Sequence, residues 1–141
     1  MSDRQRLIDE LVVDEDVRLK PYLDSVGKIT IGCGRNLTDK GISDREAFDL
    51  LDHDVDEAVS DLANAFPWFL TLDPVRQRAV VNLRFNLGPT RFRTFRKFLA
   101  AMAACDYAEA EQQLVRSKWV TQVQKRRSGR IRRQIATGAE P

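Results

Sequence analysis

The chain has 141 residues, a length typical of one domain and sufficient for a hydrophobic core without disulfides or metals. Hydrophobic residues make up 43% and charged residues 31%, which excludes a disordered or low-complexity chain. The sequence has two cysteines, one histidine and no apolar run long enough for a membrane span. This composition argues against a cysteine/histidine zinc site and against a spanning helix.

The net charge of +2 conceals an uneven distribution. Residues 1–62 contain 8 basic and 16 acidic side chains, whereas residues 63–141 contain 15 basic and 5 acidic ones. No acidic residue occurs between Arg116 and Arg133. Such a segment is typical of proteins with a polyanionic partner, such as nucleic acid, anionic lipid or an acidic cell-wall polymer. The alternative is a solvated basic face that balances the acidic half of the chain.

The first 34 residues contain a helical pattern and then two alternating ones. Apolar residues at helical spacing predict an amphipathic helix over about residues 3–15. Alternating segments at about residues 19–24 and 29–34 flank an Asp-Ser-Val-Gly turn and predict a β-hairpin. The alternation places Asp24 on the polar face of one strand and Thr30 on the polar face of the other.

After Gly41 the pattern is helical throughout. Ser43 and Glu46 form a predicted capping box for a helix to about residue 62, and Phe66-Pro67-Trp68 separates it from the next helix. Further helices are predicted from Asp73-Pro74 to Gly88, over about 92–104, from Asp106 to about 117, and over about 125–137 before Gly138. The predicted fold class is α+β, mainly α. We expect a single domain with an N-terminal hairpin lobe, about 1–62, and a helical lobe, about 63–141.

Two carboxylic acids and a hydroxyl occur where the predicted helix meets the hairpin. The negative end of the helix dipole favours the protonated form of Glu15, and burial under the helical lobe would act the same way. Asp24, on an exposed hairpin, should stay ionised, and Thr30 could orient a water. Glycoside hydrolysis uses such a pair. The chain has 21 acidic residues, however, so the pattern also fits a solvated acidic helix end.

Ordered motifs over nearly the whole chain resemble the phage-type lysozymes, the muramidases of glycoside hydrolase family 24. The spacing of Glu15, Asp24 and Thr30 is similar to that of the family's catalytic Glu, Asp and Thr. The other matching segments are Arg18-Leu19-Lys20, Tyr22-Leu23, Thr30-Ile31-Gly32-Cys33-Gly34, Arg78-Ala79 with Asn82, Phe85-Asn86 with Gly88, Ser117-Lys118-Trp119 with Gln122, Arg126 and Thr137-Gly138.

The resemblance implies a lysozyme-like fold and hydrolysis of the β-1,4 bond between N-acetylmuramic acid and N-acetylglucosamine in peptidoglycan. Glu15 would protonate the leaving oxygen. Asp24 would stabilise positive charge and either position a water with Thr30 or act on the sugar directly. No metal or organic cofactor is implied. The implied substrate-binding residues are Asn36, Phe85, Asn86, Phe98, Gln113 and Arg126, the last as an arginine that faces Glu15. Plain core packing is the alternative for the two phenylalanines.

Two positions depart from the family pattern. Arg35 follows Gly34 where a histidine is common, so a histidine-based ion pair is absent. Gly129 should weaken the last helix by up to ~1 kcal/mol relative to alanine. We also expect Cys33 and Cys105 to remain unbonded, because a cytoplasm keeps thiols reduced.

The biological role implied by the resemblance is that of a phage endolysin. It would be a monomer made in the host cytoplasm and released, through a holin, to act on the wall in the periplasm. We expect peptidoglycan as partner, with the basic segment assisting wall binding, and neither nucleic acid nor stable membrane insertion. The alternatives are a tail-associated lysozyme, a DNA-binding helical module, an inactive wall-binding protein and a lytic transglycosylase.

Overall fold

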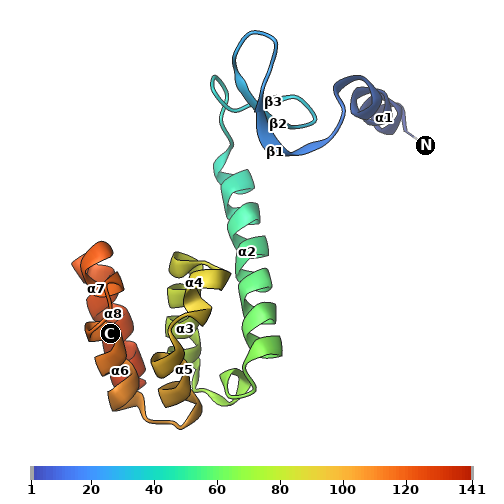
Figure 1. The fold of residues 1–141 in the computed structure, drawn as a ribbon. Coiled ribbons are helices and arrows are strands. Elements are labelled where there is room, and N and C mark those ends of the chain that lie inside the picture. Colours follow the sequence, from blue (N-terminus) through green and yellow to red (C-terminus); the bar gives the residue numbers. More distant parts are fainter. Residues whose placement is uncertain (1, 141) are drawn as a thin grey trace. The chain divides into compact units, whose positions relative to one another are not determined.

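A computed structural model describes residues 2–140. They form two compact units that divide between Leu50 and Leu51, inside helix α2 (Asp44–Ala65) and earlier than the sequence-based division near residue 62. Most residues are helical, and one small antiparallel sheet lies in the first unit (Figure 1). The predicted fold class is therefore confirmed. Among the described residues, no helix is both long and apolar enough to cross a membrane.

The N-terminal unit contains the predicted helix and hairpin. Helix α1 (Asp3–Glu15) begins where the Ser2 hydroxyl accepts a hydrogen bond from the Gln5 amide at 3.1 Å. Strand β1 (Arg18–Leu23) pairs antiparallel with β2 (Ile29–Gly32), which in turn pairs with the two-residue strand β3 (Arg35–Asn36). The hairpin is thus confirmed, and β3 is an addition that the alternation did not predict.

Two details of the predicted hairpin are wrong. Strand β1 ends at Leu23, so Asp24 opens the turn instead of lying on a strand face. Thr30 is only 4% exposed, whereas its neighbour Ile29 is 47% exposed, so the face expected to meet solvent is the covered one. Thr30 has a register partner on each side, Tyr22 of β1 and Asn36 of β3, whereas Ile29 is paired only with Leu23 of β1.

Local capping chemistry fixes the ends of the longer helices. Helix α2 follows the predicted capping box: the Ser43 hydroxyl accepts from the Glu46 amide at 3.2 Å, and Glu46 Oε1 accepts from the Ser43 amide at 3.0 Å. After the 3₁₀ turn η1 (Phe69–Thr71), α3 (Pro74–Leu87) starts at the Asp73 cap. It ends at Gly88, whose φ of 82° disfavours side chains with a Cβ.

The remaining helices agree with the prediction except near residue 94 and at Trp119–Gln122. The single helix expected over 92–104 is two helices, α4 (Pro89–Arg93) and α5 (Arg96–Ala103), separated at Thr94-Phe95. Helix α6 (Tyr107–Val115) and helix α8 (Lys125–Thr137) are confirmed. The one-turn helix α7 (Trp119–Gln122) lies between them and was not predicted.

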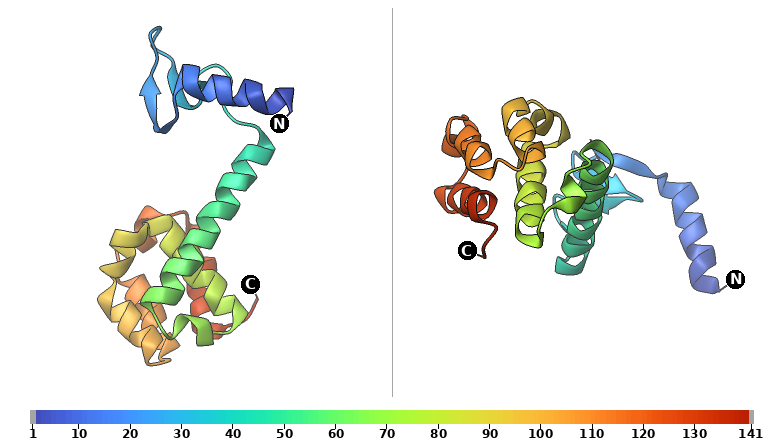
Figure 2. Two further views of the ribbon diagram at one scale, coloured as in Figure 1. Left: turned by 90° about the vertical axis from the view of Figure 1, so that its right-hand side faces the viewer. Right: turned by 90° about the horizontal axis from the view of Figure 1, so that it is seen from below.

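The hydrophobic core belongs to the second unit. Its largest fully buried side chains are Trp119, Phe69, Phe92 and Phe98. Helix α8 packs against α3 and α6, and the helices of this unit form one group in both views of Figure 2. Arg76 of α3 fastens the end of α8, because its Nε donates to the Ile135 carbonyl at 2.8 Å and its Nη2 to the Ala136 carbonyl at 3.1 Å.

Candidate active site

Glu15 is the last residue of α1, and the chain turns sharply directly after it. Asp16 has φ 63° and ψ 165°, a backbone conformation that a residue with a Cβ rarely adopts. The Asp16 carboxylate accepts from the Val17 amide at 2.8 Å, which helps to hold this turn. Within the N-terminal unit the Glu15 side chain is exposed. The turn therefore presents Glu15 at the junction between α1 and β1.

Gly34, which comes after β2, lies against the carboxyl group of Glu15. A Cβ atom at position 34 would be 3.1 Å from Glu15 Oε2 and 3.2 Å from its Cδ, closer than most real Cβ contacts. Gly34 also has a φ of 77°. Glycine is required here for two reasons: the backbone conformation and the room needed by the acid. The glycine-rich turn therefore brings the hairpin to Glu15.

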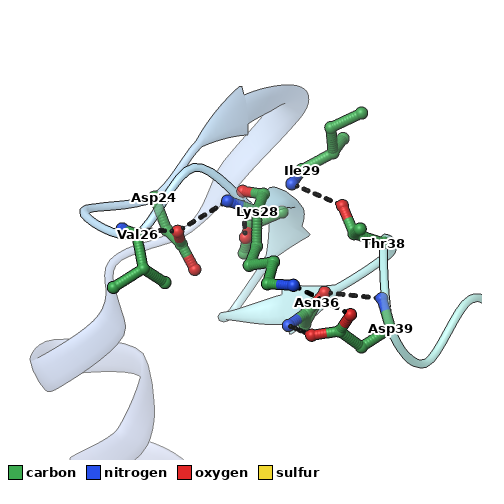
Figure 3. Close-up of polar contacts among 8 residues, drawn as sticks. Asp24, Val26, Lys28, Ile29, Asn36, Thr38 and Asp39 are labelled. Carbon is green, nitrogen blue, oxygen red and sulfur yellow. Dashed lines mark hydrogen bonds and ion pairs between the residues drawn. The ribbon is translucent and has the colours of Figure 1, made fainter.

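Asp24 is held by the turn of the hairpin. Its Oδ1 accepts from the Val26 amide at 2.9 Å and from the Lys28 amide at 2.8 Å (Figure 3). Among residues 2–140, Oδ2 accepts no hydrogen bond within ordinary distance. One carboxylate oxygen is thus fixed by the backbone, and the other remains for a ligand or a water.

Thr30 shares the Lys28 peptide with Asp24. The Thr30 hydroxyl donates to the Lys28 carbonyl at 3.1 Å, and the Asp24 amide donates to the same carbonyl at 2.9 Å. Because the single hydroxyl proton is used, Thr30 Oγ1 can only accept a further hydrogen bond. Asp24 and Thr30 therefore share the Lys28 carbonyl, whereas Glu15 lies against Gly34, and all of these residues belong to the N-terminal unit.

Asn36, a predicted substrate-binding residue, has partners of its own. Its Nδ2 donates to Asp39 Oδ2 at 3.0 Å, and its Oδ1 accepts from the Asp39 amide at 3.0 Å (Figure 3). Lys28 Nζ in turn lies 3.1 Å from Asp39 Oδ1. These contacts give Asn36 a structural role in the turn after β3, and its contact with substrate stays a prediction.

Phe85 and Asn86 lie at the end of α3 in the helical unit. Phe85 is 41% exposed and borders an apolar groove of about 550 Å³. The groove is also lined by Leu51, Val55, Val59, Phe69, Pro74, Gln77, Arg78, Val81, Asn82 and Arg127. Asn86 accepts a hydrogen bond from the indole Nε1 of Trp119 at 2.8 Å, so its oxygen also anchors a core residue.

Phe98 and Gln113 border a second hollow, of about 410 Å³, between α5 and α6. Phe98 is 1% exposed and belongs to the core, as the packing alternative anticipated. The Gln113 amide donates to Glu109 on the same helix. Arg96, Lys97 and Arg116 line the same hollow, which gives it a basic rim.

Of the two adjacent arginines at the start of α8, Arg127 is the one that is anchored. Its Nε and Nη2 donate to Asn82 Oδ1 at 3.0 and 2.7 Å. Arg126 is exposed and lines a hollow with Arg127 and Arg130. The predicted approach of Arg126 to Glu15 stays a prediction, because these residues belong to different units.

Arg35 forms an ion pair that the sequence did not predict. Its Nη2 lies 2.7 Å from Glu46 Oε2, and its Nη1 donates to Glu46 Oε1 at 3.0 Å. The hydrogen bond from Arg35, together with weaker ones from Ser43, lowers the pKa of Glu46 to about 2. Glu46 therefore links strand β3 to the start of α2. The sequence indicated only its capping role.

Comparison with known proteins decides the family. The profile of the phage lysozyme family matches residues 13–137, a range that includes Glu15, Asp24 and Thr30. The chain belongs to the phage lysozyme family. A relative from Dictyostelium discoideum, named as probable T4-type lysozyme 2, is 29% identical over 161 aligned residues that cover 94% of each chain. The resemblance seen in the motifs is confirmed, and this lysozyme-family chain is a glycosidase of the peptidoglycan-hydrolysing type.

Proposed function

We propose that this phage lysozyme cleaves the β-1,4 bond between N-acetylmuramic acid and N-acetylglucosamine, with Glu15 as general acid. The observation that supports the proposal is that Asp24 and Thr30 are both hydrogen-bonded to the main chain of Lys28, and that Gly34, four residues after Thr30, lies against the carboxyl group of Glu15. A proton donor, a carboxylate and a hydroxyl are the groups that hydrolysis with an activated water needs.

In the proposed reaction, Glu15 gives its proton to the glycosidic oxygen as the bond from that oxygen to C1 of the muramic acid breaks. A water molecule adds to C1. One of its protons is hydrogen-bonded to Thr30 Oγ1, which can only accept, and the other passes to Asp24 Oδ2. The water supplies the new C1 hydroxyl, and the Glu15 proton completes the hydroxyl of the leaving sugar. Asp24 then releases its proton to solvent, and Glu15 takes one up.

The role of Glu15 is tested by Glu15→Gln, which keeps the shape of the side chain and removes the transferable proton. Hydrolysis of purified peptidoglycan should fall by at least about a hundredfold, the usual scale of general acid catalysis. Glu10→Gln is the matched control, because Glu10 is also exposed on α1. Thermal unfolding of both variants should stay close to that of the native chain. More than a few per cent of activity in Glu15→Gln would contradict the assignment.

The products identify the reaction. Hydrolysis yields a new reducing sugar, whereas a lytic transglycosylase leaves a 1,6-anhydro end and needs no water site. Mass spectrometry of the fragments distinguishes the two, because the anhydro product is lighter by one water molecule. We expect the hydrolytic product, in keeping with the arrangement of Asp24 and Thr30.

We further propose that the enzyme acts as an endolysin, as a monomer that reaches the wall from the host cytoplasm through a holin. The phage origin of the family supports this role. Co-expression with a membrane pore in a Gram-negative cell should cause lysis, and expression of the enzyme alone should not. Lysis without the pore would contradict the proposed route of release.

A further inference from the structure

Helix α8 begins with three consecutive cations, Lys125, Arg126 and Arg127, and no acidic residue lies in its first turn. The N-terminus of a helix is the positive end of its dipole, where acidic side chains are favoured and cations are not. Gln124 at the N-cap makes no side-chain hydrogen bond to the helix. Within the helix itself, the positive charge at the start of α8 is therefore balanced neither by a side-chain cap nor by an acidic residue of the first turn.

Three arginines concentrate this charge around one hollow. Arg126, Arg127 and Arg130 line it together with Asn82 and Gln124, and its volume is about 340 Å³. Residues three and four apart lie on one helix face, where like charges destabilise the helix. Five side chains from α3 and the start of α8 thus converge on one small polar space, which we call the α8 basic hollow.

The chemistry of the α8 basic hollow favours an anion. Guanidinium groups only donate hydrogen bonds. The Asn82 oxygen already accepts from Arg127, so the group that Asn82 still offers is its amide nitrogen, another donor. Within residues 51–140, Arg126 and Arg130 form no ion pair. On another side of α8, by contrast, Arg132 Nε lies 3.5 Å from Glu111 Oε1.

We propose that the α8 basic hollow binds a carboxylate of the peptide that peptidoglycan carries on its muramic acid. This inference rests on the proposed function. The hollow shares Asn82 and Arg127 with the apolar groove that Phe85 borders, so a peptide carboxylate could enter the hollow while less polar parts of the same substrate lie along the groove. A planar guanidinium matches a carboxylate with two parallel hydrogen bonds.

The test uses two probes: a disaccharide–tetrapeptide prepared from peptidoglycan, and the same fragment with its carboxylates converted to amides. Binding is measured by calorimetry in the Glu15→Gln background, so that no turnover occurs. Arg130→Gln alters the hollow. Arg133→Gln is the matched control, because it removes the same charge from an exposed position of α8 that does not line the hollow.

We expect Arg130→Gln to weaken binding of the carboxylate fragment by about ten- to a hundredfold, as for a lost charge-assisted hydrogen bond. Arg133→Gln should leave that binding unchanged, and the amidated fragment should bind all variants alike. Equal weakening by both substitutions would overturn the proposal in favour of diffuse attraction. The proposal would also be overturned if Arg130→Gln weakened the binding of inorganic phosphate or short duplex DNA more than the binding of the fragment. Peptidoglycan hydrolysis by the native chain tests the proposed function separately.

Discussion

The two glycines of the last helix should respond to alanine in opposite ways. Gly129 lies in the middle of α8, has no positive φ, and a Cβ atom there would have no neighbour within 4 Å. Gly129→Ala therefore removes backbone freedom from the unfolded chain at no steric cost. We expect it to raise the free energy of unfolding by about 1 kcal/mol. The melting temperature should rise by about 3 °C.

Gly138→Ala supplies the opposite case. Gly138 ends α8 with φ 64°, a conformation that costs an alanine about 1–2 kcal/mol. A Cβ atom there would also lie 2.6 Å from Arg76 Nη1. That guanidinium bonds the carbonyls of Ile135 and Ala136, so its displacement weakens the contact between α3 and α8. We expect the free energy of unfolding to fall by at least about 1 kcal/mol.

Urea unfolding monitored by tryptophan fluorescence measures both changes. Both tryptophans, Trp68 and Trp119, lie in the helical unit, so the signal reports the unit that contains α8. The midpoints of the two variants should move in opposite directions with an unchanged m-value. A shift of the same sign for both, or a loss of stability in Gly129→Ala, would refute the reasoning.

Three further predictions concern the N-terminal unit and the thiols. Asp16→Gly should raise stability by no more than about 1 kcal/mol, because relief of the φ of 63° outweighs loss of the hydrogen bond from the Val17 amide, and lower stability in thermal unfolding would contradict this. The pKa of Glu46 is lowered to about 2. The ionised Glu46 carboxylate therefore stabilises the fold above pH 4.5, and this stabilisation is lost as the pH falls towards 2. Carboxyl NMR should show this pKa rising in Arg35→Gln. Both thiols, Cys33 and Cys105, are free and exposed, so a thiol reagent should titrate two without denaturant; fewer would indicate a bond.

Much of the fold could be predicted because its signals are local. The caps at Ser43 and Asp73 and the glycines at the helix ends act within one turn of backbone, so sequence order alone predicts them. The break between α4 and α5 was missed because apolar residues continue through Phe95 at helical spacing and neither glycine nor proline marks the turn. The two-residue strand β3 is too short to show an alternation.

For the candidate site too, features encoded in neighbouring residues could be predicted, and features created by tertiary contacts could not. The spacing of Glu15, Asp24 and Thr30 led to the prediction that they are catalytic, which stays a prediction, and all three belong to one unit of the structure. Alternation separates the two faces of a strand but does not tell which face is covered, so the burial of Thr30 could not be predicted. The Arg35–Glu46 pair joins residues brought together only by folding.

The dependence of the core on α8 has a consequence for the timing of synthesis. Ile131 and Ile135 fill the core, and Arg76 bonds carbonyls 59 and 60 residues further along the chain. The contacts of the N-terminal unit close within the first 50 residues. On the ribosome, the residues of this unit emerge early, whereas the helical unit cannot complete its core until α8, which ends at Thr137, has emerged. Until then α8 does not cover the apolar surface around Trp119. We expect a stalled or truncated nascent chain to expose this surface to chaperones and proteases.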